Sequence, residues 1–94
     1  MKVIEIRAIE DCFGGSQIRE LILSDEITEK FLYKLSKDCI LQYFPHFTKP
    51  FFKIRKEGLY DIKGIVGNKS LRIYIKNSKK ISIFEIIEII NNFQ

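Results

Sequence analysis

Three apolar runs separated by glycine-containing turns constrain the fold of this chain most strongly. The runs cover residues 51–56, 59–66 and 71–76, and the two breaks between them contain Gly58 and Gly67. The runs are rich in Ile, Phe and Tyr, which favour strands, and short loops with glycine typically join antiparallel neighbours. The sequence therefore predicts a meander of three antiparallel strands in the second half of the chain.

The rest of the chain contains one clear strand signal and two less regular segments. Residues 2–9 alternate between apolar and polar positions as a strand does, and a pair of glycines follows them. Residues 17–23 fit either a short helix capped by Ser16 or a short strand, and we favour a short helix or an irregular turn. Residues 40–52 are aromatic and interrupted by two prolines, which argue against a helix interior, and we assign no helix or strand to residues 40–50. We expect the rings mainly to cap the core, with the lining of a pocket or a subunit contact as the alternative.

Two amphipathic helices are predicted, one in the middle of the chain and one at its end. Ser24 is a favourable N-cap for the first helix, and apolar residues recur at every fourth position from Ile27 to Cys39. The second helix covers residues 82–93 and begins with a capping box, in which a serine is followed three positions later by Glu85. Both helices should bury one apolar stripe.

These elements predict a single α+β domain over residues 1–94, in the order β-α-β-β-β-α. Two amphipathic helices bury their apolar stripes most simply on one face of a four-stranded, mainly antiparallel sheet. A chain of 94 residues is long enough to bury a core of its own. The other face of the sheet is then open to water or to a partner.

Composition and cysteine content exclude several classes of protein. No apolar run approaches the roughly 18 residues that span a bilayer, and the N-terminus lacks the apolar stretch of a signal peptide. We therefore expect a cytoplasmic protein that does not contact a membrane. Cys12, Cys39 and the single histidine, His46, lie far apart and lack the spacing of metal ligands, so no metal or cofactor is predicted.

The positive charge of the chain is concentrated in the predicted meander. Residues 49–80 hold ten Lys and Arg against two acidic residues, a net charge of +8, whereas residues 1–48 and 81–94 each have a net charge of −2. Strand alternation places a basic set on the open sheet face: Lys53, Arg55, Lys63, Arg72, Tyr74 and Lys76. A basic face with an aromatic ring suits single-stranded RNA or DNA. Alternatively, these lysines solvate the face and guard the sheet edge, and AT-rich codons supply them.

The loop after the first strand is another candidate site, composed of Cys12, Gly14, Gly15 and Ser16. A glycine-rich turn before a helix presents N–H groups to an anion, and a cysteine there has a lowered pKa. However, the pattern matches no nucleotide-binding or phosphatase motif, and no histidine or second cysteine lies nearby as a base. A small anion-binding or thiol enzyme is thus a weaker alternative to a plain turn.

The last predicted helix has an apolar stripe that is wider than contact with one sheet face requires. Phe84 falls within its polar side and Ile89 lies at the margin of the stripe. We therefore predict that Phe84, Ile87 and Ile89 contact a second copy or another protein. Because no catalytic constellation is apparent, the leading interpretation is a non-enzymatic binding or regulatory module that self-associates.

Overall fold

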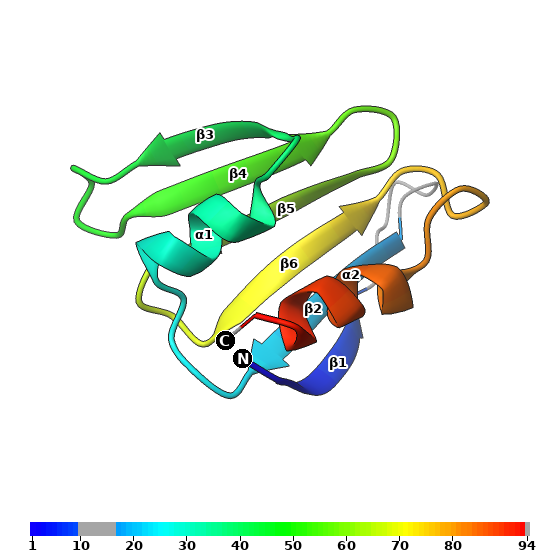
Figure 1. Ribbon diagram of the computed structural model, residues 1–94, viewed down its shortest axis with the longest axis horizontal. Helices are drawn as coiled ribbons and strands as arrows, with labels where there is room; N and C mark the ends of the chain where they lie inside the picture. Colours follow the sequence, from blue (N-terminus) through cyan, green and yellow to red (C-terminus); the bar gives the residue numbers. More distant parts are fainter. Residues whose placement is uncertain (10–16, 94) are drawn as a thin grey trace.

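The computed structural model describes residues 1–9 and 17–93, and its central feature is one antiparallel sheet of six strands (Figure 1). The strands are β1 (Val3–Ile9), β2 (Gln17–Leu23), β3 (Ile40–Phe44), β4 (Phe51–Lys56), β5 (Tyr60–Ile65) and β6 (Ser70–Ile75). Their order across the sheet is β1-β2-β6-β5-β4-β3, so β1 and β3 form its edges. The helices α1 (Glu29–Leu35) and α2 (Ile83–Asn91) cover the same face.

The predicted α+β class is right, but the predicted four-stranded sheet is wrong because two further strands join it. Residues 17–23, expected to form a helix or turn, are strand β2, which pairs with β1 and β6. Pairing decides the ambiguity, because in a strand Leu21 and Leu23 point to the same face, and both are fully buried. Residues 40–44, to which no helix or strand was assigned, form the edge strand β3 against β4.

Helix α1 is shorter than predicted and begins with a different cap. The hydroxyl of Thr28 accepts a hydrogen bond from the backbone N–H of Phe31 at 3.1 Å. Ser24, the predicted cap, instead accepts a hydrogen bond from the backbone N–H of Lys2 at 2.9 Å and so joins the end of β2 to the start of β1. The helix buries Phe31, Leu32 and Leu35.

A hydrogen bond joins α1 to the edge strand β3. The hydroxyl of Tyr43 donates to the carboxylate of Glu29 at 2.8 Å. This bond to a carboxylate raises the pKa of Tyr43 to about 12, because ionising the phenol would remove the donor and place two negative charges together. The contact positions α1 over the β3 side of the sheet.

The core lies between the sheet and the two helices. Its fully buried side chains include Leu21, Phe52, Ile54, Ile62 and Ile73 from the sheet, and Ile86 and Ile90 from α2. Gly64 of β5 leaves room for the ring of Phe52, since a Cβ at Gly64 would lie 2.7 Å from Cζ of that ring. In the described ranges, neither helix has the length and apolar character needed to cross a membrane.

The predicted capping box of α2 is confirmed. The hydroxyl of Ser82 accepts a hydrogen bond from the N–H of Phe84 at 3.2 Å, and the carboxylate of Glu85 accepts one from the N–H of Ser82 at 2.8 Å. These bonds satisfy donors that helical hydrogen bonding leaves unpaired, and they start a helix in isoleucine-rich sequence that otherwise favours strands.

Removing this cap is expected to destabilise the protein modestly. The substitution Ser82→Ala leaves an N–H of the first turn without its acceptor, which should lower the free energy of unfolding by about 1 kcal/mol. Urea denaturation measures the change, with Ser78→Ala as the control, because Ser78 is an exposed serine outside both helices. Equal effects of the two substitutions would show that the cap contributes nothing.

Candidate nucleic-acid interface

The sheet face away from α1 and α2, called the open face below, carries the predicted basic set. The register aligns Lys53 with Lys63 and Lys63 with Arg72, so three cations stand side by side on β4, β5 and β6. The same register continues to both edges of the sheet. We call the whole alignment the polar row: Gln42, Lys53, Lys63, Arg72, Glu20 and Arg7.

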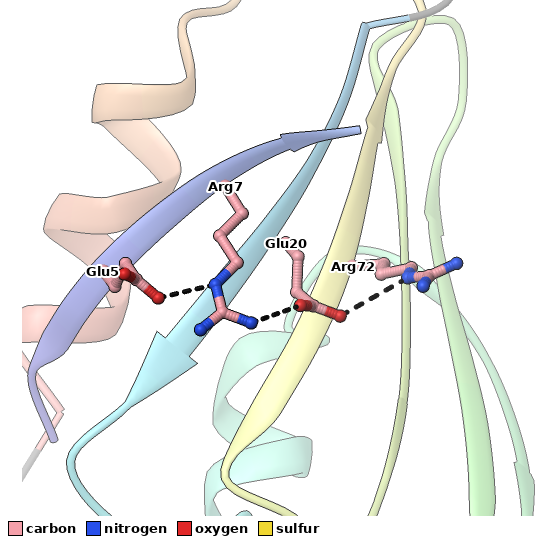
Figure 2. A network of polar contacts seen from close by, with 4 residues as sticks. All are labelled: Glu5, Arg7, Glu20 and Arg72. Atoms are coloured by element: carbon pink, nitrogen blue, oxygen red, sulfur yellow. Dashed lines mark hydrogen bonds and ion pairs between the residues drawn. The ribbon is translucent and has the colours of Figure 1, made fainter. Parts of the chain in front are cut away.

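Carboxylates balance the charge at the β1 end of the polar row (Figure 2). The carboxylate of Glu20 lies 3.7 Å from Nη1 of Arg7 and 3.6 Å from Nε of Arg72. Arg7 also lies 2.6 Å from the carboxylate of Glu5, on the same strand. Two acids and two arginines therefore alternate across β1, β2 and β6, and this part of the open face has little net charge.

Asp61 balances a second group of cations on the open face. Its buried carboxylate lies 3.4 Å from Nε of Arg55 and 3.3 Å from Nζ of Lys76. Tyr74 stands directly opposite Asp61, and Nζ of Lys63 lies 4.8 Å from the centroid of its ring. Arg55, Tyr74 and Lys76 are thus engaged with neighbouring side chains, which leaves them less available to a ligand.

Lys53 and Lys63 differ from the other cations of the open face. Within the part of the chain that the structure describes, neither has a carboxylate at ion-pair distance, and the neutral ring of Tyr74 that Lys63 contacts leaves the charge of Lys63 unbalanced. Like charges directly opposite each other destabilise a sheet. Guarding an edge does not explain this cost, because β4 and β5 are internal strands. An anion bound between the two lysines would relieve the repulsion.

Three phenylalanine rings lie beside the polar row. Phe44 and Phe51 stand opposite each other on β3 and β4, and their rings stack with centroids 6.1 Å apart. Phe47, from the turn after β3, stacks on Phe44 at 5.1 Å and is 59% exposed. The stack therefore ends in a ring that is open to solvent.

Sequence reasoning missed this aromatic stack, because it assigned the rings of residues 40–52 mainly to the core. Phe52 is in the core, but its neighbour Phe51 is not. Successive residues of a strand point to opposite faces, so the burial of Phe52 places Phe51 on the open face. Because Phe51 and Phe52 are adjacent in a predicted strand, the sequence already indicated that one of the two rings lies on the open face.

Two shallow hollows on the open face are each lined by both cationic and apolar side chains. One hollow of about 330 Å³ is lined by Phe51, Lys63, Arg72, Glu20 and the polar residues Asn68 and Ser70, among others. Another, of about 170 Å³, is lined by Ile40, Gln42, Lys53 and Arg55. The first hollow thus combines an aromatic ring, the cation of Lys63 and hydrogen-bonding groups, with the ion pair of Arg72 and Glu20 at its side. A ring and a cation are contacts that single-stranded nucleic acid uses.

A larger hollow of about 630 Å³ lies on the helix side, lined by Lys30, Tyr33, Lys34, Lys37, Asn92 and Phe93. Lys30 lies in the first turn of α1, whereas Lys34 lies in its last turn and Lys37 follows its C-cap, Ser36. Cations are favourable there because they complement the negative end of the helix dipole. A structural reason therefore accounts for Lys34 and Lys37, in contrast to Lys53 and Lys63.

The other two predicted sites fare differently. The loop of Cys12, Gly14, Gly15 and Ser16 lies outside the described residues, so the anion-binding or thiol site stays a prediction. Cys39 is half-buried, and its Sγ lies 3.5 Å from the carbonyl oxygen of Lys37. Among the described residues, no three Cys, His or acidic side chains gather as metal ligands do.

The predicted interface residues of α2 do not form one surface. Phe84, which is 70% exposed, and the half-buried Ile87 share a stripe with Asn91. The side chain of Asn91 accepts a hydrogen bond from the N–H of Val3 at 2.9 Å, so this stripe faces edge strand β1. Ile89 lies about 140° around the helix from Phe84 and points elsewhere.

Comparisons of the chain with models of protein families, with curated proteins and with solved structures gave no match.

Proposed function

We propose that the protein binds single-stranded nucleic acid on the open face of its sheet. The observation that supports this most directly is the opposed pair Lys53 and Lys63, on internal strands, beside the exposed stack that ends at Phe47. Cations bind phosphates regardless of sequence, and aromatic rings stack on bases. The face combines both contacts.

The spacing of the open face suits one strand that crosses β4, β5 and β6. Adjacent strands are about 4.8 Å apart, so a backbone that follows the polar row meets Lys53 and then Lys63 before it reaches Arg72, whose charge Glu20 balances. Phe51 lies two residues before Lys53 on the same face, about 7 Å away along β4. With the phosphates along the polar row, the bases lie over the hollow that Phe51 lines. Unpaired bases are needed for this contact, which favours a single strand over a duplex.

The proposal is tested by titrating labelled oligo(dT) and oligo(U) with the protein, using fluorescence anisotropy. Binding at about 50 mM salt is expected. The logarithm of the binding constant should fall linearly with the logarithm of the salt concentration, with a slope of about −0.7 for each phosphate contacted. The double variant Lys53→Glu/Lys63→Glu should bind at least about tenfold more weakly. The magnitude of its salt slope should be about 1.4 smaller, because two phosphate contacts are lost.

Two further variants separate a specific site from general electrostatics. Lys34→Glu/Lys37→Glu changes the net charge equally but on the helix side, and should bind as the wild type does. Phe47→Ala removes a stacking ring without changing charge, and should weaken binding about fivefold or more with an unchanged salt slope. No binding by the wild type, or an equal loss in both charge variants, contradicts the proposal.

We also propose that the chain self-associates, which the exposed stripe of α2 favours. Phe84 and Ile87 lie on the side of the helix that faces the edge strand β1. Exposed apolar side chains next to an edge strand are typical of subunit contacts. Light scattering should give a mass above the 11.1 kDa of one chain as concentration rises. A constant monomer mass contradicts self-association.

A further inference from the structure

We infer that two copies of the chain pair antiparallel through their β1 strands to form one continuous sheet. This rests on the self-association proposed above and adds the surface and the register of the contact. Strand β1 is an edge of the sheet, and edge strands present unpaired backbone N–H and C=O groups. It also exposes two large apolar side chains, Ile4 at 66% and Ile6 at 43%.

The sequence of β1 is complementary to itself in this arrangement. A two-fold axis at Ile6 places Glu5 opposite Arg7 of the partner subunit, and places the two copies of Ile6 opposite each other. Both subunits then contribute the same pair, as an isologous contact requires. Opposite charges that stand directly across two strands are favourable. The register is thus specified by charge as well as by apolar contact.

The other edge strand, β3, lacks this complementarity. The same antiparallel pairing centred on β3 would place Gln42 opposite its own copy, and no residue of this strand is charged. Phe44, one of the exposed residues of β3, also belongs to the aromatic stack. Charge complementarity therefore favours β1 as the strand that pairs.

A two-fold axis perpendicular to the sheet keeps equivalent side chains of the two copies on the same face. Ile6 shares the face of Leu21, which is the helix side, so the two Ile6 side chains meet beside the stripes of Phe84 and Ile87. Glu5 and Arg7 lie on the open face. Both copies then present their polar rows on the same side, as one surface of twice the width.

A bulge in β1 limits how much of the strand is available. The register shifts between Val3 and Glu5, and the N–H of Val3 is already bonded to Asn91. Bulges of this kind block regular pairing at an edge. Residues 5–9 pair regularly with β2, so the axis at Ile6 falls on the regular part. The backbone contact is short, and the α2 stripes on either side have to supply apolar burial.

Charge reversal tests the register. The single variants Glu5→Arg and Arg7→Glu each place like charges opposite each other, and each should raise the dimer dissociation constant at least about tenfold. An equimolar mixture of the two variants should regain a dimer, because every introduced charge then meets its opposite in the mixed pair. Light scattering gives the masses, and native mass spectrometry identifies the mixed dimer by its mass.

Glu57→Arg and Lys49→Glu serve as matched controls, because both residues are exposed and lie in turns away from β1. Circular dichroism verifies that each variant is folded. A wild-type chain that stays monomeric overturns both self-association and strand pairing. A dimer that is unaffected by either single reversal, or variants that fail to recombine, overturns the β1 pairing alone and leaves self-association standing.

Discussion

Replacing Phe52 with alanine is expected to lower the free energy of unfolding by about 3–5 kcal/mol. The ring is completely buried on β4, in the core between the sheet and the helices. Deleting it removes a large apolar surface from the core and leaves a cavity that the neighbouring strands cannot close. A domain of this kind has a total stability of about 5–15 kcal/mol, so the variant loses a large fraction of it.

Urea denaturation of wild type and variant measures this loss. Phe47→Ala is the matched control, because it deletes the same atoms from a ring that is 59% exposed. The control should change the free energy of unfolding by only about 0.5 kcal/mol. If the two substitutions cost the same, Phe52 does not occupy the core position described above.

Gly64→Ala is expected to destabilise the protein by about 1–3 kcal/mol, although the same change often stabilises a protein by restricting its unfolded state. The added Cβ would lie 2.7 Å from Cζ and 3.0 Å from Cε1 of Phe52, and 3.4 Å from Cβ of Leu71. The ring cannot move aside because it is fully buried. The clash therefore outweighs the gain in the unfolded state.

A double-mutant cycle with Phe52→Leu tests whether that clash is the cause. Leucine keeps an apolar side chain at the position but removes the outer ring atoms that approach Gly64. In the Phe52→Leu background, Gly64→Ala should cost at least about 1 kcal/mol less than in the wild type. Additive costs would mean that alanine destabilises the strand for a reason unrelated to Phe52.

The elements that could be predicted are those with strong local signals. The meander was predicted to within a residue or so at each boundary, because glycine turns separate its runs. The capping box of α2 is likewise encoded in four consecutive residues. Strand β2 could not be predicted, because Ile18, Leu21 and Ile22 also fit a helix. Its pairing with β6, which joins Leu21 to Leu71, decides the matter and is a long-range contact.

The candidate site shows the same limit. Alternation within strands predicted a basic set, and the register places its members together on the open face. The neutralisation of Arg72 by Glu20 was not predictable, because it depends on β2 lying next to β6. The aromatic stack depends on β3 in the same way, since Phe44 stands opposite Phe51 only because residues 40–44 form a strand, which the sequence left undetermined.

The position of β6 has a consequence for how the chain folds as it is synthesised. This strand is the last of the six in the sequence, yet it lies between β2 and β5 in the sheet. The hairpin of β1 and β2 emerges from the ribosome first but has no neighbour until β6 follows it, and such distant pairings form slowly. Until then one side of β2 is bare and prone to aggregation. Nascent chains that stop before residue 70 should therefore depend on chaperones, whereas chains that include β6 should not.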